Sequence, residues 1–123
     1  MKKKANQLLS AFSAEVTRLP SAHSQMMIAL DFALGPSSEV VIAGALENED
    51  TKKMLRTLES RFMPRKVVLL RHPGKEYDEI VDVAKFSENR VSVDGKTTVY
   101  VCKAHVCHLP TADAEVMLEQ IDE

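Results

Sequence analysis

The sequence predicts an α/β domain, because three short apolar runs of strand length alternate with segments of helical periodicity. The runs cover residues 39–44, 66–71 and 98–102, and the first is uninterrupted by charge from Val40 to Gly44. Uncharged, β-branched runs are typical of strands covered on both faces of a parallel sheet. We therefore expect a three-layer domain with a short parallel sheet of about three strands.

Strand order follows from the connections between the runs. A helix-length segment separates each pair of runs, and crossovers between parallel neighbours are almost always right-handed. Since the first run has the most continuously apolar character, it is predicted to be central, which gives the order 2-1-3.

Composition limits the classes of function. A chain of 123 residues with 45% hydrophobic content is close to the commonest size of a single domain with one core. The formal charge of −2 provides no overall attraction for nucleic acid or an anionic membrane. Apolar runs are too short to span a membrane, and the amino terminus lacks the continuous apolar stretch of a signal peptide. We expect a cytoplasmic protein with no nucleic-acid or membrane partner.

A helical hairpin is predicted before the first strand. Apolar residues recur at helical spacing from about residue 3 to residue 19, and Pro20 ends the pattern. Ser21 is the expected N-cap of a second helix that ends at Gly35. Residues 1–36 are thus predicted as a hairpin leading into the α/β domain of residues 37–123, within one compact unit.

The loop after the first run is the place where an open α/β sheet binds a ligand. It contains a single glycine, Gly44, followed by Glu47, Glu49 and Asp50, whereas a phosphate site favours several glycines and no competing negative charge. We interpret these acids as N-capping and first-turn charges of the next helix.

Three further segments complete the predicted fold. One helix follows the acidic loop, a shorter one is expected near residues 77–86, and a last one begins after Pro110. Asp94-Gly95 indicates either a small hairpin or a plain loop before the third strand. The expected buried stripe of the helix after the acidic loop is Met54, Leu55, Leu58 and Phe62.

Cys102, His105, Cys107 and His108 form the densest cluster of chemically capable side chains. Zinc sites usually bring close ligand pairs from two separated segments, and the remaining His23 and His72 are isolated in the sequence, so we predict no metal site. If residues 102–107 continued as one strand, the two cysteines would point to opposite faces. We expect both thiols to be reduced, with Cys102 buried and Cys107 nearer the surface; a redox-active pair is the alternative.

Basic residues bracket the second run. No interleaved aromatic residues or nucleic-acid motif accompany them, so we interpret them as a solvated surface. They are Arg61, Arg65, Lys66, Arg71, His72 and Lys75.

An ordered series of short motifs runs along nearly the whole chain. They are Arg18-Leu-Pro20, Ala29-Leu-Asp31, Glu39-Val-Val-Ile-Ala-Gly44, Phe62-Met-Pro-Arg-Lys-Val-Val-Leu-Leu-Arg71, Gly95-Lys96, and Tyr100-Val-Cys102 with Cys107 and Pro110-Thr111. Together they resemble the carboxyl-terminal region of the large thioredoxin-domain-containing proteins, the family of the spermatogenesis-associated and bacterial YyaL-type proteins. In that family a thioredoxin-like domain precedes a helical toroid similar to six-hairpin glycosidases and sugar epimerases, and this region follows.

The resemblance implies no catalytic residue for this chain, because the family's redox and carbohydrate sites belong to the two preceding domains. It implies a non-catalytic α/β module whose partners are the rest of a larger chain, or a second copy bound through the N-terminal helices. The alternative is a small thiol-redox protein that uses Cys102 and Cys107. Neither hypothesis calls for a cofactor or a metal.

Overall fold

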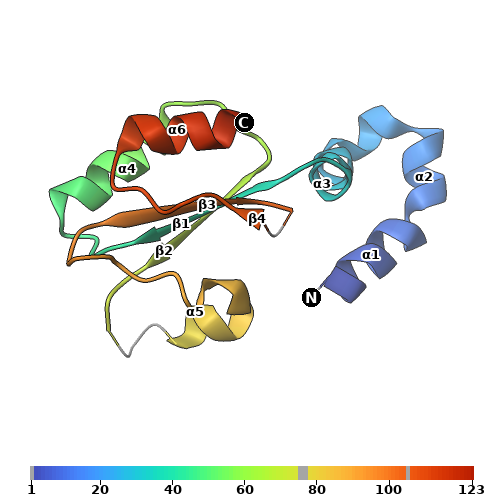
Figure 1. Ribbon diagram of the computed structural model, residues 1–123. Helices are drawn as coiled ribbons and strands as arrows, with labels where there is room; N and C mark the ends of the chain where they lie inside the picture. Colours follow the sequence, from blue (N-terminus) through green and yellow to red (C-terminus); the bar gives the residue numbers. More distant parts are fainter. Residues whose placement is uncertain (1, 75–77, 105) are drawn as a thin grey trace. The chain divides into compact units, whose positions relative to one another are not determined.

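The computed structural model describes residues 2–74, 78–104 and 106–123. The chain divides into two compact units, Met1–Pro36 and Ser37–Glu123. Helices make up the first unit, and the second contains a sheet with helices on its faces (Figure 1).

The first unit contains α1 (Lys2–Ala11), α2 (Ser13–Arg18), a short 3-10 helix η1 (Pro20–His23) and α3 (Ser24–Leu34). The first predicted helix is therefore interrupted at Phe12. At this point the Ser13 hydroxyl donates to the carbonyl of Ser10 at 2.8 Å, a local side-chain bond of the kind that competes with the helical ladder.

The start of the second predicted helix was wrong and its end was correct. Ser21 lies inside the 3-10 helix, and α3 begins at Ser24 without a side-chain cap from His23. The helix ends at Gly35, whose N–H donates to the carbonyl of Asp31 at 3.0 Å.

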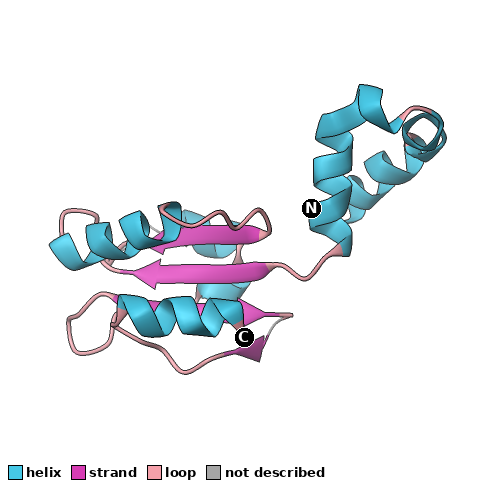
Figure 2. Cartoon of the chain, turned by 90° about the horizontal axis from the view of Figure 1, so that it is seen from above, coloured by secondary structure: helices cyan, strands magenta, loops and turns pink. Residues whose placement is uncertain are grey.

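The sheet of the second unit has the order β2-β1-β3-β4. Its strands are β1 (Ser38–Ala43), β2 (Lys66–Arg71), β3 (Thr98–Lys103) and β4 (Val106–Cys107), and they lie side by side in the view from above (Figure 2). The α/β class is confirmed, and β1 lies between β2 and β3. A short fourth strand, which the sequence analysis did not identify, is added at the edge.

Strand direction corrects the prediction of an all-parallel sheet. β1 and β2 are parallel, with Val40 opposite Val68, but β3 is antiparallel to β1, with Ala43 opposite Thr98. The helix between β2 and β3 is α5 (Asp78–Val83), six residues long, which extends about 9 Å. A six-residue strand spans about 20 Å, so α5 does not by itself run the length of the sheet, and β3 starts at the end of the sheet where β2 ended, with Arg71 and Thr98 both opposite Ala43.

The main core lies between one face of the sheet and two helices, α4 (Glu49–Glu59) and α6 (Ala114–Asp122) (Figure 1). Val40 and Ile42 of β1 and Val101 of β3 are fully buried there against Met117 of α6. The opposite face carries a smaller cluster built on Val41, Ala43 and Tyr100, and α5 lies on that side (Figure 1). This gives the three layers that the sequence predicts.

Two local predictions have opposite outcomes. Phe62 is 93% exposed instead of buried, because α4 ends at Glu59, before Phe62. Asp94 and Gly95 both have positive φ, and Val93 and Lys96 form an isolated antiparallel bridge around them. The turn signal before the third strand is therefore confirmed as a tight turn.

Candidate functional site

The two cysteines form a disulfide across a hairpin at the edge of the sheet. Cys102 of β3 is paired directly with Cys107 of β4, their sulfurs are 2.06 Å apart and their α-carbons 3.9 Å apart. Residues opposite each other in an antiparallel pair present their side chains on the same face. The expectation of two reduced thiols is therefore wrong.

The reason for the error is the turn between the two strands. The segment 103–106 contains neither glycine nor proline, which argued for a continuous strand. In the structure Ala104 takes a positive φ of 48°, a conformation that is uncommon for a residue with a Cβ. β3 ends at Lys103 and β4 begins at Val106, so the chain reverses over two residues, of which His105 lies outside the described residues.

The two sulfurs have different surroundings. Cys102 is 1% exposed, whereas Cys107 is only partly buried. The predicted difference in burial is confirmed. Cys107 is thus the more accessible of the two residues.

Arg90 supplies a positive charge next to the disulfide. Its Nη2 donates to Sγ of Cys107 at 3.1 Å, and its guanidinium carbon lies 5.4 Å from the centre of the Tyr100 ring, within the range of a cation–π contact. Its Nε is buried without a hydrogen-bond partner in the part of the chain that the structure describes. Sequence reasoning missed Arg90, because it precedes Cys107 by 17 residues and no spacing motif joins them.

The loop that carries Arg90 is held from several sides. The guanidinium of Arg71, at the end of β2, donates to the carbonyls of Ser87 and Glu88. The Tyr100 hydroxyl donates to the carbonyl of Val91 at 2.7 Å. The chain is therefore hydrogen-bonded to side chains of strands both before and after Arg90. The position of the Arg90 guanidinium beside Cys107 is thus set by the tertiary structure.

Of the histidines in the predicted cluster, His105 lies outside the described residues, and the contacts given for His108 do not include the disulfide. His108 has its Nδ1 3.5 Å from Oε2 of Glu123, and its backbone N–H donates to Val101. Within residues 2–74, 78–104 and 106–123, no group of three or more His, Cys, Asp or Glu side chains is placed to hold a metal ion.

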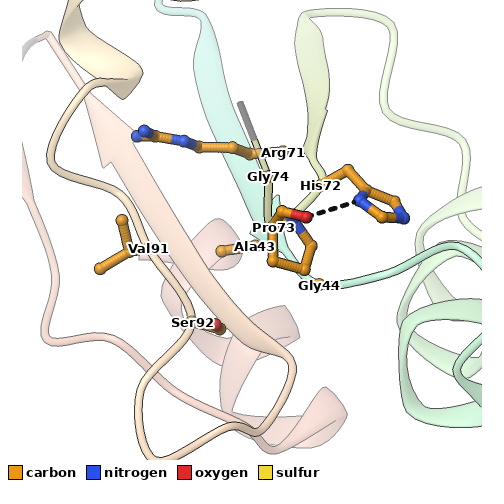
Figure 3. Close-up of a pocket in the computed structure, with 8 residues that line it drawn as sticks. All are labelled: Ala43, Gly44, Arg71, His72, Pro73, Gly74, Val91 and Ser92. Atoms are coloured by element: carbon orange, nitrogen blue, oxygen red, sulfur yellow. Dashed lines mark hydrogen bonds between the residues drawn. The ribbon is translucent and has the colours of Figure 1, made fainter. Parts of the chain in front are cut away.

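A small cavity of about 130 Å³ lies at the carboxyl ends of β1 and β2 (Figure 3). In Figure 3 the ring of His72 is bonded to the carbonyl of Pro73, at 3.0 Å, while Arg71 extends in the opposite direction. The side chains of Arg71 and His72 at this edge are thus hydrogen-bonded within the protein. The residues that line the cavity are Ala43, Gly44, Arg71, His72, Pro73, Gly74, Val91 and Ser92.

The acidic loop beside this cavity behaves as predicted in one part only. Glu49 and Asp50 are in the first turn of α4, where acids favour the helix dipole. Glu47 instead lies 3.4 Å from Nε2 of His72. A backbone hydrogen bond at Glu47, and then His72, lower the pKa of this carboxyl from its ordinary value.

Two of the basic residues around β2 form hydrogen bonds or ion pairs with the protein, whereas the sequence predicted a solvated surface. Lys66 donates to the carbonyl of Leu58, and Arg61 pairs with Asp122 at 2.6 Å. Lys75 lies outside the described residues. Lys66 thus ties β2 to the end of α4, and Arg61 ties the segment after α4 to the end of α6.

Comparisons with known proteins find that the chain is similar in sequence to part of one group of larger proteins. No protein-family model and no solved structure matches it. It is similar to spermatogenesis-associated protein 20 of Rattus norvegicus, with 31% identity over 106 residues, and to that of Homo sapiens, with 29% identity over 106 residues. Each match covers 86% of this chain and 13% of the relative. The chain is thus similar to a small region of the spermatogenesis-associated proteins, as its motifs indicate.

Proposed function

We propose that the chain is an interaction module of a larger protein, with no catalytic role in its main function. The larger protein would have the organisation of the thioredoxin-domain-containing family that the motifs resemble, and the chain would pack against it through the helices of residues 2–34. Two findings support this proposal: the matched relatives are far longer than the chain, and the helical unit exposes apolar side chains.

The exposed apolar side chains are the observation that carries the proposal. Among side chains 3–36, only Val16 is buried. Leu8 is 54% exposed, Ile28 63% and Leu34 80%. Clusters of exposed apolar residues mark interaction surfaces in proteins that are otherwise well folded. We infer that the rest of a larger chain covers these helices, and that isolated chains cover them by pairing with a second copy.

The cellular setting belongs to the same proposal. No helix among the described residues is long and apolar enough to cross a membrane. We place the protein in the cytoplasm, because two cysteines in 123 residues are fewer than a secreted disulfide scaffold contains.

Light scattering at micromolar concentration tests the module proposal. We expect a dimer or a concentration-dependent assembly, and we expect Ile28→Glu to return the chain to a monomer. Leu109→Glu is the matched control, because Leu109 is 84% exposed but belongs to the other unit.

A wild-type monomer that also fails to bind an apolar fluorescent dye would contradict the proposal, since the helices would then be covered within the chain. A monomer that binds the dye strongly through the helical unit, with loss of binding in Ile28→Glu, would support an interface for the rest of a larger chain.

A second candidate function, thiol–disulfide exchange, is favoured by the Cys102–Cys107 disulfide. Disulfides in the cytosol are usually transient and either catalytic or redox-sensing. Thiol counting on the native protein in glutathione buffers of graded reducing strength tests it. A disulfide that opens and closes within the range of these buffers supports exchange, and one that stays closed in all of them contradicts it.

A further inference from the structure

Arg90 donates a hydrogen bond to Cys107, but the sulfur of a disulfide is a poor partner for a guanidinium. A disulfide sulfur is a weak hydrogen-bond acceptor, whereas the guanidinium is always charged and has five N–H donors. Here Nη2 faces this sulfur at 3.1 Å, and the buried Nε has no partner among the described residues. A thiolate at the same position would be a far better acceptor for both the charge and the N–H groups.

We propose that Cys107 is the sulfur that exchanges with external disulfides, and that Arg90 is the positioning residue that stabilises its thiolate in the reduced protein. This inference rests on the proposed thiol function. It assigns different roles to the two cysteines: Cys107 is partly buried and next to a cation, while Cys102 is 1% exposed and acts as the resolving thiol.

The exchange is a balanced two-electron transfer to a substrate disulfide. The Cys107 thiolate attacks one substrate sulfur, forms a mixed disulfide and releases the other substrate sulfur as a thiolate. Cys102 then loses its proton to water and attacks Sγ of Cys107, which restores the internal disulfide and releases the second substrate thiolate. The dithiol is oxidised, the substrate disulfide is reduced, and its two thiolates take up two protons.

Access to Cys107 agrees with this assignment. Cys107 is in β4, the edge strand of the sheet, and Val106 next to it is 74% exposed. In-line attack on the sulfur of Cys102 is hindered, because Cys102 is 1% exposed. Any mixed disulfide should therefore form on Cys107.

The other charged groups near the hairpin do not offer the same stabilisation. Lys103 of β3 donates from Nζ to the carbonyl of Ile121 at 2.5 Å. His108 faces the carboxylate of Glu123, which partly cancels any positive charge on the ring. Of the cations described near the disulfide, Arg90 is the one whose hydrogen bond ends on sulfur.

Alkylation of the reduced protein over a range of pH measures the two thiols separately. Cleavage after Lys103 places Cys102 and Cys107 on different peptides, so mass spectrometry reads both rates from the wild-type chain. We expect the reactivity of Cys107 to titrate at least about one pH unit below the reference of 8.5. Cys102 should react slowly and titrate above the reference, because burial disfavours a thiolate.

Substitution of Arg90 separates electrostatics from structure. Arg90→Gln should raise the pKa of Cys107 by about one unit, and Arg90→Lys should restore part of the decrease because it keeps the charge. The matched control is Arg56→Gln, since Arg56 is an exposed arginine on α4 that pairs with Glu49. If the role of Arg90 were purely structural, its replacement would change the thermal midpoint, but the pKa of Cys107 would not differ between the glutamine and lysine variants.

Oxidised glutathione tests the assignment of the exchanging sulfur. Cys102→Ser should form a stable adduct with glutathione on Cys107, whereas Cys107→Ser should form little. At about pH 9.5, above the pKa expected for Cys107 with and without Arg90, Arg90→Gln should shift the glutathione equilibrium toward the internal disulfide by about tenfold. If a serine variant does not fold, trapping of the wild-type mixed disulfide with acid supplies the same answer.

The outcomes distinguish this inference from the function on which it rests. If the native disulfide never opens in glutathione buffers, the thiol function itself fails. If it opens but Cys107 titrates at 8.5 or above, or Arg90→Gln and Arg56→Gln behave alike, the exchange function stands and the role of Arg90 is refuted. An adduct found mainly on Cys102 would refute the assignment of Cys107.

Discussion

Replacing Gly44 with alanine should be among the most damaging small changes in the sheet unit. A Cβ at this position would lie 2.6 Å from Oγ1 of Thr51 and 2.8 Å from Oγ1 of Thr97. These two hydroxyls are hydrogen-bonded to each other at 2.8 Å, and the residues are 0% and 3% exposed. The new methyl group must therefore separate a buried hydroxyl pair that joins α4 to the chain just before β3.

The expected cost has two parts. Inserting a methyl group into a well-packed core costs about 1–3 kcal/mol, and leaving buried hydroxyls without partners costs about 1–3 kcal/mol. We expect Gly44→Ala to lower the free energy of unfolding by about 3 kcal/mol. Gly95→Ala is the control, because its Cβ meets nothing within 4 Å and only the left-handed conformation, with φ of 69°, costs about 1–2 kcal/mol.

Urea unfolding followed by near-ultraviolet circular dichroism is a suitable assay. Both tyrosines, Tyr77 and Tyr100, belong to the sheet unit, and the chain has no tryptophan. The tyrosine band of this signal therefore reports the unfolding of the sheet unit even if the helical unit, which contains Phe12 and Phe32, melts separately.

A double-mutant cycle tests the physical cause. In a Thr51→Ala background the nearest atom to the new methyl group is gone, so Gly44→Ala should cost less there than in the wild type, by at least about 0.5 kcal/mol. Additive costs, or a loss in Gly44→Ala no larger than that in Gly95→Ala, would refute the steric argument.

Two further predictions concern packing and charge. Met117→Ala should lower the free energy of unfolding by about 2–5 kcal/mol, because this side chain is 0% exposed. The control is Val116→Ala, at a neighbouring position that is 40% exposed, which should cost under about 1 kcal/mol. Equal losses in urea unfolding would contradict the assignment of the α6 core face. In an NMR titration the Glu47 carboxyl should have a midpoint below its ordinary pKa of 4.5. In His72→Gln the midpoint should lie closer to the ordinary pKa but remain below it, because the backbone hydrogen bond is the larger cause of the shift. Since the folded-state pKa is the lower one, the associated stabilisation is present above the unfolded value and is lost as the pH falls through the folded value; an unshifted midpoint would contradict the contacts described for Glu47.

Strands, turns and helix ends could be predicted from the sequence where they depend on residues that are close together in the chain. The buried run of β1, the turn at Asp94-Gly95 and the end of α3 at Gly35 each depend on a few neighbouring residues. Hydrophobic periodicity and turn chemistry act over such short distances. The α/β class and the central place of β1 follow from those elements.

Strand direction and the disulfide depended on the tertiary structure. Whether β3 runs parallel or antiparallel to β1 depends on the end of the sheet at which the chain enters β3, and hydrophobic periodicity carries no information on that. The pairing of Cys102 with Cys107 depended on a turn at Ala104 that contains no turn residue by composition.

The sequence alone determined that this chain alternates helices with buried strands and that Cys102 belongs inside while Cys107 belongs near the surface. Only the fold could bring Arg90 to Cys107, across 17 residues, because that contact requires the Ser87–Val91 loop to be anchored by Arg71 and Tyr100 from two different strands. Spacing patterns encode what one segment does by itself, whereas a contact of this kind exists only after separate segments have packed.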